Sequence, residues 1–137
     1  MRITESRLRQ LIRGCLISEQ KISVAGRPME VELADTPQGR AAGLMYRDEL
    51  QVDSGMLFNF PDATERSFYM KNTGIPLSIA FADDVGVIKT IKDMTPFDET
   101  PVSSDCDAKY ALEVPQGYFS ENGIGVDDLI ELGVLDD

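Results

Sequence analysis

A small cluster of polar side chains follows directly after an apolar segment near the middle of the chain. Lys71, Asn72 and Thr73 come straight after Met70, within the most hydrophobic part of the sequence. Lysine offers three hydrogen-bond donors, asparagine two donors and an acceptor, and threonine a hydroxyl. Together they have the chemistry to hold a carboxylate, a phosphate or the hydroxyls of a sugar. We therefore take this cluster as the centre of a candidate ligand site.

Several other residues have the chemistry to complete this site. Arginine suits bidentate capture of a planar anion, and two arginines flank a short predicted helix. Methionine adapts to irregular ligand shapes, and tyrosine combines an aromatic ring with a polar tip. An acidic residue in a later glycine-rich segment could also take part. The candidate ligand-binding residues are Arg40, Met45, Arg47, Met56, Tyr69, Met70, Lys71, Asn72, Thr73 and Asp128.

The same residues also have a purely structural interpretation. Asn72-Thr73-Gly74 is good turn chemistry without any ligand. Lys71 could simply pair with an acid, and the methionines could fill the core. The sequence alone leaves both interpretations open.

The chain contains no histidine, and this excludes several classes of reaction. Mechanisms of the Ser-His-Asp or Cys-His type need an imidazole as base. The two cysteines, Cys15 and Cys106, are far apart and outside any CxxC pattern, which disfavours a zinc site or a disulfide scaffold. Acid pairs such as Asp83-Asp84 could hold Ca²⁺, but none has an EF-hand pattern, and solvated loops are the simpler interpretation. We predict neither a metal nor a cofactor.

The length and charge of the chain narrow its class further. A chain of 137 residues suits one domain with a substantial core. Thirteen Lys and Arg against 24 Asp and Glu give a net charge of −11, which opposes binding to nucleic acids and to anionic membranes. No apolar run is long enough for a transmembrane segment. With no signal peptide and no paired cysteines, the sequence predicts a cytoplasmic location.

The first 19 residues have the pattern of an amphipathic helix. Apolar side chains recur on one face, and four arginines supply positive charge. This leader could pack on the domain, bind a protein partner or act as a targeting tag, with membrane binding as a further alternative. We therefore predict a helical leader at 1–19 and a single β domain at 20–137.

Short apolar runs between turn residues predict β-strands in the rest of the chain. Seven or eight short strands with one or two short helices indicate a mainly β fold, either a β-sandwich or a partly open barrel. Strands are predicted at 22–24, 29–33, 56–60, 68–70, 76–82, 87–94, 110–114 and 129–132. The strands at 22–24 and 29–33 are predicted to form one hairpin and those at 76–82 and 87–94 another, with 76–82 buried between two layers. Turns are predicted at Pro61-Asp62 and Asn72-Thr73-Gly74, helical segments at 37–46 (with Thr36 as N-cap) and 117–122, and a long irregular loop at 95–109.

Five motifs in this order and spacing resemble the DUF192 family, also called UPF0127. They are GLMYR (Gly43–Arg47), GMLFNF (Gly55–Phe60), FYMKNTGIPLSIAF (Phe68–Phe81), YALEVPQGYF (Tyr110–Phe119) and NGIGVDD (Asn122–Asp128). The resemblance implies a compact, mostly β domain and no particular activity, because the function of the family is unknown. It also implies that export is an alternative, since many relatives are exported. Asp127 stands where the family has glycine, and Ser78 where relatives typically carry an acid.

Three functions remain open at this point. The first is a non-enzymatic module that binds a small anionic or polyhydroxyl ligand or a partner, and a concave pocket holding Lys71 and Arg47 would favour it. The second is a histidine-independent hydrolase or carbohydrate-active enzyme, which two facing carboxylates, one with a raised pKa, would favour. The third is an assembly module that docks through residues 1–19, which an adjacent flat apolar patch would favour.

Overall fold

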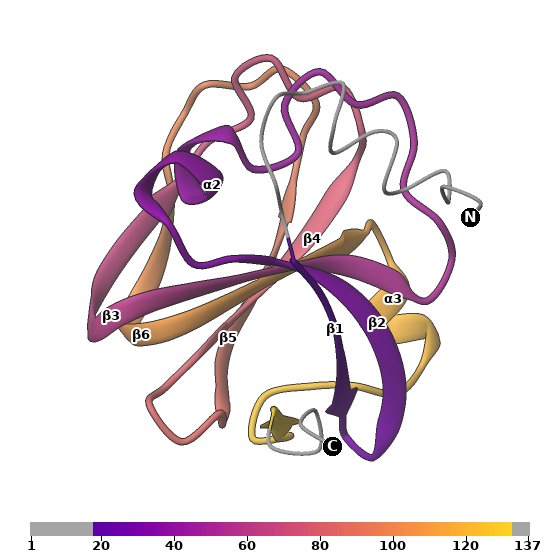
Figure 1. Cartoon of the computed structure of the whole chain (residues 1–137), viewed down its shortest axis with the longest axis vertical. Helices are drawn as coiled ribbons and strands as arrows, with labels where there is room; N and C mark the ends of the chain where they lie inside the picture. Colours follow the sequence, from indigo (N-terminus) through magenta and orange to yellow (C-terminus); the bar gives the residue numbers. More distant parts are fainter. Residues whose placement is uncertain (1–17, 133–137) are drawn as a thin grey trace.

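The computed structural model describes residues 18–132, which form one strongly curled β-sheet with two short helices (Figure 1). The predicted mainly β fold, of the partly open barrel type, is confirmed. The helix predicted for residues 1–19 lies outside the described residues, apart from Ser18 and Glu19, which belong to the first strand. The elements are β1 (Ser18–Val24), β2 (Arg27–Ala34), α2 (Pro37–Ala42), β3 (Ser54–Phe68), β4 (Leu77–Ala82), β5 (Ile88–Met94), β6 (Val102–Pro115), α3 (Tyr118–Glu121) and β7 (Ile130–Glu131).

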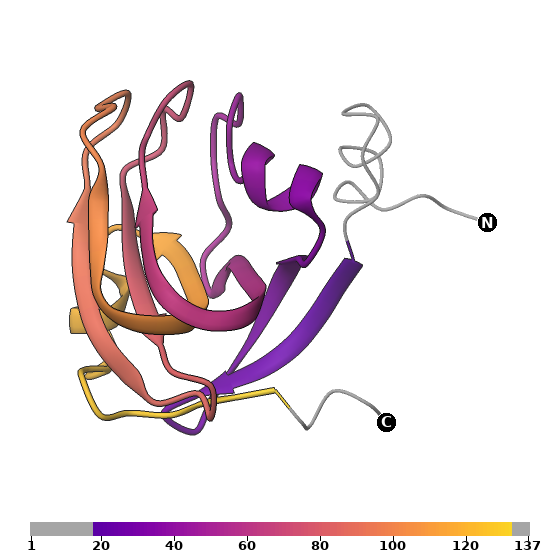
Figure 2. The ribbon, with the colours of Figure 1, turned by 90° about the vertical axis from the view of Figure 1, so that its left-hand side faces the viewer.

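The strands follow the order β5-β4-β6-β3-β2-β1-β7 across the sheet. Only β2 and β3 pair in parallel, and every other neighbouring pair is antiparallel. Figure 2 shows the sheet curling from the β4–β5 hairpin round to the β1–β2 hairpin. Both hairpins were predicted from the sequence.

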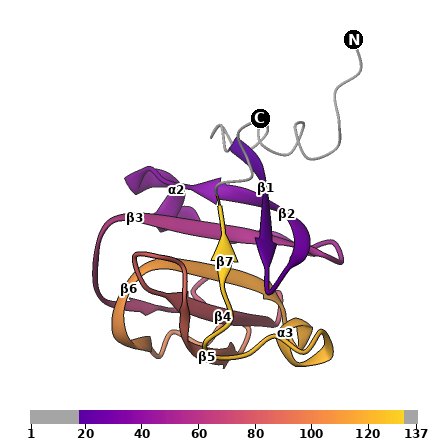
Figure 3. The same cartoon turned by 90° about the horizontal axis from the view of Figure 1, so that it is seen from below.

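The two edges of the curled sheet meet through the last described segment of the chain. The backbone N–H of Ile88 donates to the carbonyl of Asp128 at 2.9 Å, and that of Ile130 donates to Gly86 at 2.8 Å. Immediately afterwards β7 pairs with β1, and Figure 3 shows it crossing between β1 and β5. Asp127 has a φ of 80°, in the left-handed region that aspartate tolerates better than most residues other than glycine.

Both faces of the sheet carry buried apolar side chains, because successive strand residues point to opposite sides. All six residues of β4 are buried, which confirms the prediction that this strand lies between two layers. The first core cluster takes residues from all seven strands and fills the inside of the curl. The second lies on the other face and is built around Met56, Phe58, Ile79 and Phe81.

A bend in β3 covers this second cluster. The register between β3 and β6 shifts between Asn59 and Thr64, and Pro61, which has no N–H to offer the ladder, lies in that gap. The bulge bends the strand without ending it, so the pair continues and Phe60 and Phe68 pack on the second cluster.

Three sequence predictions are therefore wrong in this region. Pro61-Asp62 does not separate two strands, and 68–70 is not a separate strand, because β3 runs unbroken from Ser54 to Phe68 and folds back within its own length. Much of the loop predicted at 95–109 is strand, since β6 starts at Val102 and pairs with the second half of β3.

The short helix α2 begins as predicted and ends earlier. The Thr36 hydroxyl accepts a hydrogen bond from the N–H of Gly39 at 3.0 Å, which is N-terminal capping. The helix stops at Ala42 instead of reaching residue 46, because Gly43 has a φ of 48° and turns the chain away. The segment that follows α2 therefore crosses the second core cluster, and its residue Leu44 is buried in that cluster.

β3 approaches β6 so closely at Gly55 that a larger residue there should destabilise the fold. A Cβ at this position would overlap with the carbonyl oxygen of Glu113 and lie 3.1 Å from Val114. Because backbone atoms cannot rotate away, Gly55→Ala should lower the free energy of unfolding by about 1–3 kcal/mol, measured by urea denaturation. Gly125→Ala is the matched control, with no atom within 4 Å of its Cβ, and should change stability by less than about 0.5 kcal/mol. Equal effects of the two variants would contradict this packing.

Candidate functional site

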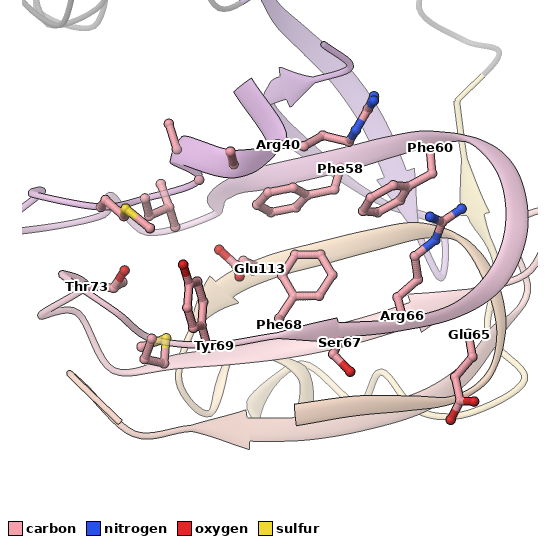
Figure 4. A pocket seen from close by; sticks show the side chains of 16 residues that line it. Arg40, Phe58, Phe60, Glu65, Arg66, Ser67, Phe68, Tyr69, Thr73 and Glu113 are labelled. Carbon is pink, nitrogen blue, oxygen red and sulfur yellow. The ribbon is translucent and has the colours of Figure 1, made fainter. Parts of the chain in front are cut away.

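A half-open pocket of about 480 Å³ lies between the two arms of the bent strand β3. Figure 4 shows Phe58 and Phe60 on one arm facing Arg66, Phe68 and Tyr69 on and just after the other. The segment that follows α2 forms a further wall. A volume of ~300–1,000 Å³ is usual for sites that bind small molecules. The lining residues are Arg40, Ala41, Ala42, Gly43, Leu44, Met45, Phe58, Phe60, Glu65, Arg66, Ser67, Phe68, Tyr69, Met70, Thr73 and Glu113.

One carboxyl group reaches this pocket from its base. Glu113 lies in β6, directly opposite Met56 of β3 and Ile79 of β4, so its side chain emerges from the apolar face of the second core cluster. In Figure 4 it points into the space between Phe58, Phe68 and Tyr69. The ionisable carboxyl of Glu113 therefore lies among aromatic rings.

The Glu113 carboxyl is buried and unpaired. Its residue is only 4% exposed, and no group within residues 18–132 forms a hydrogen bond with the carboxyl. Removal from water disfavours the charged form, and this burial raises the pKa of Glu113 to about 8. The carboxyl is therefore mostly protonated at neutral pH when the pocket is empty.

Two arginines lie at one end of the pocket, on either side of Phe60 in Figure 4. The Arg66 guanidinium lies 3.8 Å from the ring centroid and forms an ion pair with Asp62 at 2.9 Å. Arg40 lies 5.3 Å from the same centroid and donates to the carbonyl of Asn59 at 3.0 Å. Among the described residues no carboxylate pairs with Arg40, so its charge is not neutralised by a direct neighbour.

A second carboxyl of the lining is oriented differently. Glu65 accepts a hydrogen bond from the Ser103 hydroxyl at 3.1 Å, and in Figure 4 it points away from the pocket interior. The two carboxyl groups therefore do not face each other across the hollow.

Half of the residues predicted from the sequence line this pocket. They are Arg40, Met45, Tyr69, Met70 and Thr73. The Thr73 hydroxyl donates a hydrogen bond to the backbone carbonyl of Lys71, two residues earlier, at 2.9 Å. Met56 is completely buried beneath the pocket in the second core cluster.

Two further predicted residues, Arg47 and Asn72, line a neighbouring hollow of about 510 Å³. The Arg47 guanidinium forms a two-pronged pair with the carboxylate of Glu32, and the two side chains are only 7% and 13% exposed. The Asn72 amide donates to the Tyr46 hydroxyl at 2.8 Å. Lys71 is exposed and lines neither of the two hollows.

Three loops meet beside this second hollow, at the upper edge of the sheet in Figure 2. Backbone hydrogen bonds join Tyr46 to Asn72 at 2.8 Å and Phe97 to Thr73 at 3.0 Å. Met70 is joined to Asp98 at 2.9 Å in the same way. The loops after α2, β3 and β5 therefore hold one another in place beside the pocket.

Asp128 and Asp83, which were candidate ligands in the sequence, and the loop acid Asp105 have structural partners away from the pocket. The Asp128 carboxylate accepts from the N–H of Gly125 at 2.8 Å, away from the pocket. Asp83 accepts from Val87 at 2.9 Å within its turn, and Asp105 forms an ion pair with Lys92 at 2.7 Å. In the part of the chain that the structure describes, no three Cys, Asp or Glu side chains are grouped to hold a metal ion.

Sequence reasoning missed Glu113, although it lies within one of the family motifs. The signal was present in the segment Tyr110–Val114, where a single acid interrupts an otherwise apolar predicted strand. Alternation along that strand puts Glu113 on the opposite face from Leu112 and Val114. The bend in β3 forms the hollow above Glu113, and this bend could not be predicted from the sequence.

The fold and the pocket define a curled β domain of a known family. The sequence model of DUF192, described as "Uncharacterized ACR", matches residues 20–132. The chain therefore belongs to the DUF192 family, as its motifs indicated. No curated protein has a significant sequence match to it.

Two crystal structures are similar to this chain over most of its length. A protein from Sinorhizobium meliloti 1021, provisionally named a transcription regulator, is 33% identical, with a TM-score of 0.81 over 84% of this chain and 94% of that one. A protein of unknown function from Novosphingobium aromaticivorans DSM 12444 is 31% identical, with a TM-score of 0.75 over 84% of both chains. Within residues 18–132, no helix has the length and hydrophobicity needed to cross a membrane.

The raised pKa of Glu113 predicts an unusual dependence of stability on pH. The folded-state pKa of about 8 exceeds the ordinary value of 4.5, so the folded protein holds this proton more tightly than the unfolded chain does. This contribution to stability is complete below about pH 4.5. It is lost as pH rises to about 8, at up to about 1.4 kcal/mol per pH unit.

Glu113→Gln removes this contribution because glutamine does not titrate. Compared with the native protein, the variant should gain stability steadily between pH 5 and 8 and level off above pH 8. The measurement is the free energy of unfolding of both proteins in urea across this range. Parallel curves for the two proteins would show that the carboxyl is not buried in its uncharged form.

Proposed function

We propose that this domain binds a small organic molecule in the pocket between the two arms of β3. The observation that carries the proposal is the Glu113 carboxyl, which is buried at the base of an open hollow and has no hydrogen-bond partner within residues 18–132. Buried polar groups in folded proteins nearly always have a partner, because leaving one unpaired costs about 1–3 kcal/mol. A ligand that enters the pocket would supply the missing partner.

The lining of the pocket supports binding of a compact molecule with an apolar body and a few polar groups. Four aromatic residues and two methionines line it, together with the polar residues Arg40, Glu65, Arg66, Ser67, Thr73 and Glu113. Sites for small molecules commonly have this composition, in which apolar walls provide affinity and a few polar groups fix orientation. Met45 and Met70 add side chains that can adjust to the shape of a ligand.

Two-carboxylate hydrolysis, the second function considered from the sequence, has less support. Glycoside hydrolysis needs two carboxyl groups on opposite sides of the scissile bond, about 5–10 Å apart. Glu113 has the raised pKa of a general acid, but Glu65 is bonded to Ser103 and points away. The arrangement thus favours binding over this mechanism. The net charge of −11 also opposes contact with DNA phosphates, so we propose no DNA-binding role of the kind that the name of the Sinorhizobium relative suggests.

The proposal predicts that one-ring fragments bind in this pocket and nowhere else on the domain. The test is a panel of such fragments carrying amine, amidine, hydroxyl, amide or carboxylate groups, added to ¹⁵N-labelled protein. Ligands should shift the amide signals of Leu44, Phe68 and Glu113 in two-dimensional NMR spectra. Because a new ring at Ala42 would fill the pocket, Ala42→Phe should abolish the binding of every hit.

The matched control places the same ring on the same helix outside the pocket. Gln38 is exposed on α2 and does not line the hollow, so Gln38→Phe should bind the hits as the native protein does. The proposal fails if no fragment shifts the pocket signals, or if binding survives Ala42→Phe unchanged.

A further inference from the structure

We infer that the pocket selects an organic cation, in which a protonated amine or amidine on an apolar body places its nitrogen against the Glu113 carboxylate. This inference rests on the proposed function and names the chemical class of the ligand.

The oxygens of the Glu113 carboxylate at the base of the pocket need hydrogen-bond donors. An ionised carboxyl has only acceptor oxygens, and no donor within residues 18–132 is bonded to those of Glu113. An ammonium group or the two parallel N–H groups of an amidine would satisfy them. Hydrogen bonds between opposite charges are about twice as strong as neutral ones.

Aromatic side chains surround the Glu113 carboxyl. Phe58 and Phe68 meet edge to face with centroids 4.9 Å apart, and in Figure 4 Glu113 points toward them and toward Tyr69. Aromatic faces attract cations through their quadrupoles, and they also suit the apolar part of an organic cation. A carboxylate beside aromatic rings is the combination that such a ligand requires.

The charged and titratable groups of the pocket lining do not neutralise Glu113. They are Arg40 from α2, together with Arg66 and Tyr69 on and just after the second arm of β3, and Glu65, which points away. Arg66 is paired with Asp62, and both arginines lie around Phe60 at the end of the pocket. The strands directly beside Glu113 present Met56 and Ile79, which carry no charge. Burial is accordingly the one cause of its raised pKa.

The charge of the whole protein favours the same ligand. A net charge of −11 creates a negative potential that attracts cations to the surface and speeds their association. An anionic ligand would be repelled over most of its approach. Of the two arginines that line the pocket, Arg66 is already paired with Asp62, and only Arg40 has no carboxylate partner among the described residues.

A cation that pairs with Glu113 must displace its proton, so binding and ionisation are linked. With a carboxyl pKa of about 8 in the empty pocket, affinity should fall about fivefold from pH 8 to pH 7 and nearly tenfold for each further unit below that. Between pH 9 and pH 6 the dissociation constant should rise about 90-fold for a ligand whose own charge is constant. A neutral ligand that accepts a hydrogen bond from the protonated carboxyl would show the opposite trend.

The experiment uses benzamidine, benzamide and benzoate, which have nearly the same shape and carry a positive, a zero and a negative charge. Calorimetric titration of the full chain at pH 6, 7, 8 and 9 should find that benzamidine binds most tightly at pH 9. At pH 6 its binding should release nearly one proton, which is measured by repeating the titration in buffers of different ionisation enthalpy. This readout uses the native protein and does not depend on whether any variant folds.

A pair of variants separates direct contact from general charge. Glu113→Gln should weaken benzamidine binding at pH 9 at least about tenfold and abolish its pH dependence. Glu99→Gln removes a carboxylate from an exposed position outside the pocket lining, and should change the affinity by less than about twofold.

The outcomes distinguish this inference from the proposed function. If benzamide or benzoate shifts the pocket signals and binds as tightly as benzamidine at pH 9, the cation inference is wrong and a small-molecule pocket remains. Retention of pH-dependent benzamidine binding in folded Glu113→Gln would also overturn it. If neither these compounds nor the wider fragment panel binds in the pocket, both the inference and the proposed function fail.

Discussion

The burial of one carboxyl group beneath a bent strand is the constraint on which the rest of the site depends. Glu113 comes from the sheet itself, where its neighbours Met56 and Ile79 belong to the core. A carboxyl on an exposed sheet face would be hydrated and would keep an ordinary pKa. Here the second arm of β3 and the segment after α2 close over that face and remove water from it, which raises the pKa of Glu113 to about 8.

The bend that creates the pocket has a local cause and distant supports. A register shift between Asn59 and Thr64 bends the β3–β6 pair over the second core cluster, and Phe60 and Phe68 anchor the overhanging part. The loops beyond it are joined by backbone hydrogen bonds from Tyr46, Met70 and Phe97. The hollow is therefore held open by a framework that is already formed, and a ligand need not create it. Preformed sites of this kind avoid part of the entropic cost of binding.

Much of the fold could be predicted because its determinants are local. Alternating apolar residues predicted the β1–β2 and β4–β5 hairpins, and Thr36 predicted the start of α2. The continuity of β3 through Pro61 could not be predicted, since proline usually ends a strand and the partner that keeps the pairing lies about 40 residues later. For the same reason the site was predicted only in part. Arg40, Tyr69 and Thr73 were predicted from the chemistry of their own side chains, whereas Glu113 becomes a site residue only through the tertiary structure that forms the pocket above it.

The most direct test of this account is the pKa of the Glu113 carboxyl in the free protein. It can be measured by following the side-chain carboxyl ¹³C signal between pH 4 and 10, with Glu113→Gln used to assign the resonance. Because the group is buried without a partner in the described chain, its titration midpoint should lie near pH 8, well above the ordinary 4.5. A midpoint near 4.5 would mean that water or another donor already satisfies the carboxylate, and the site would lose its physical basis.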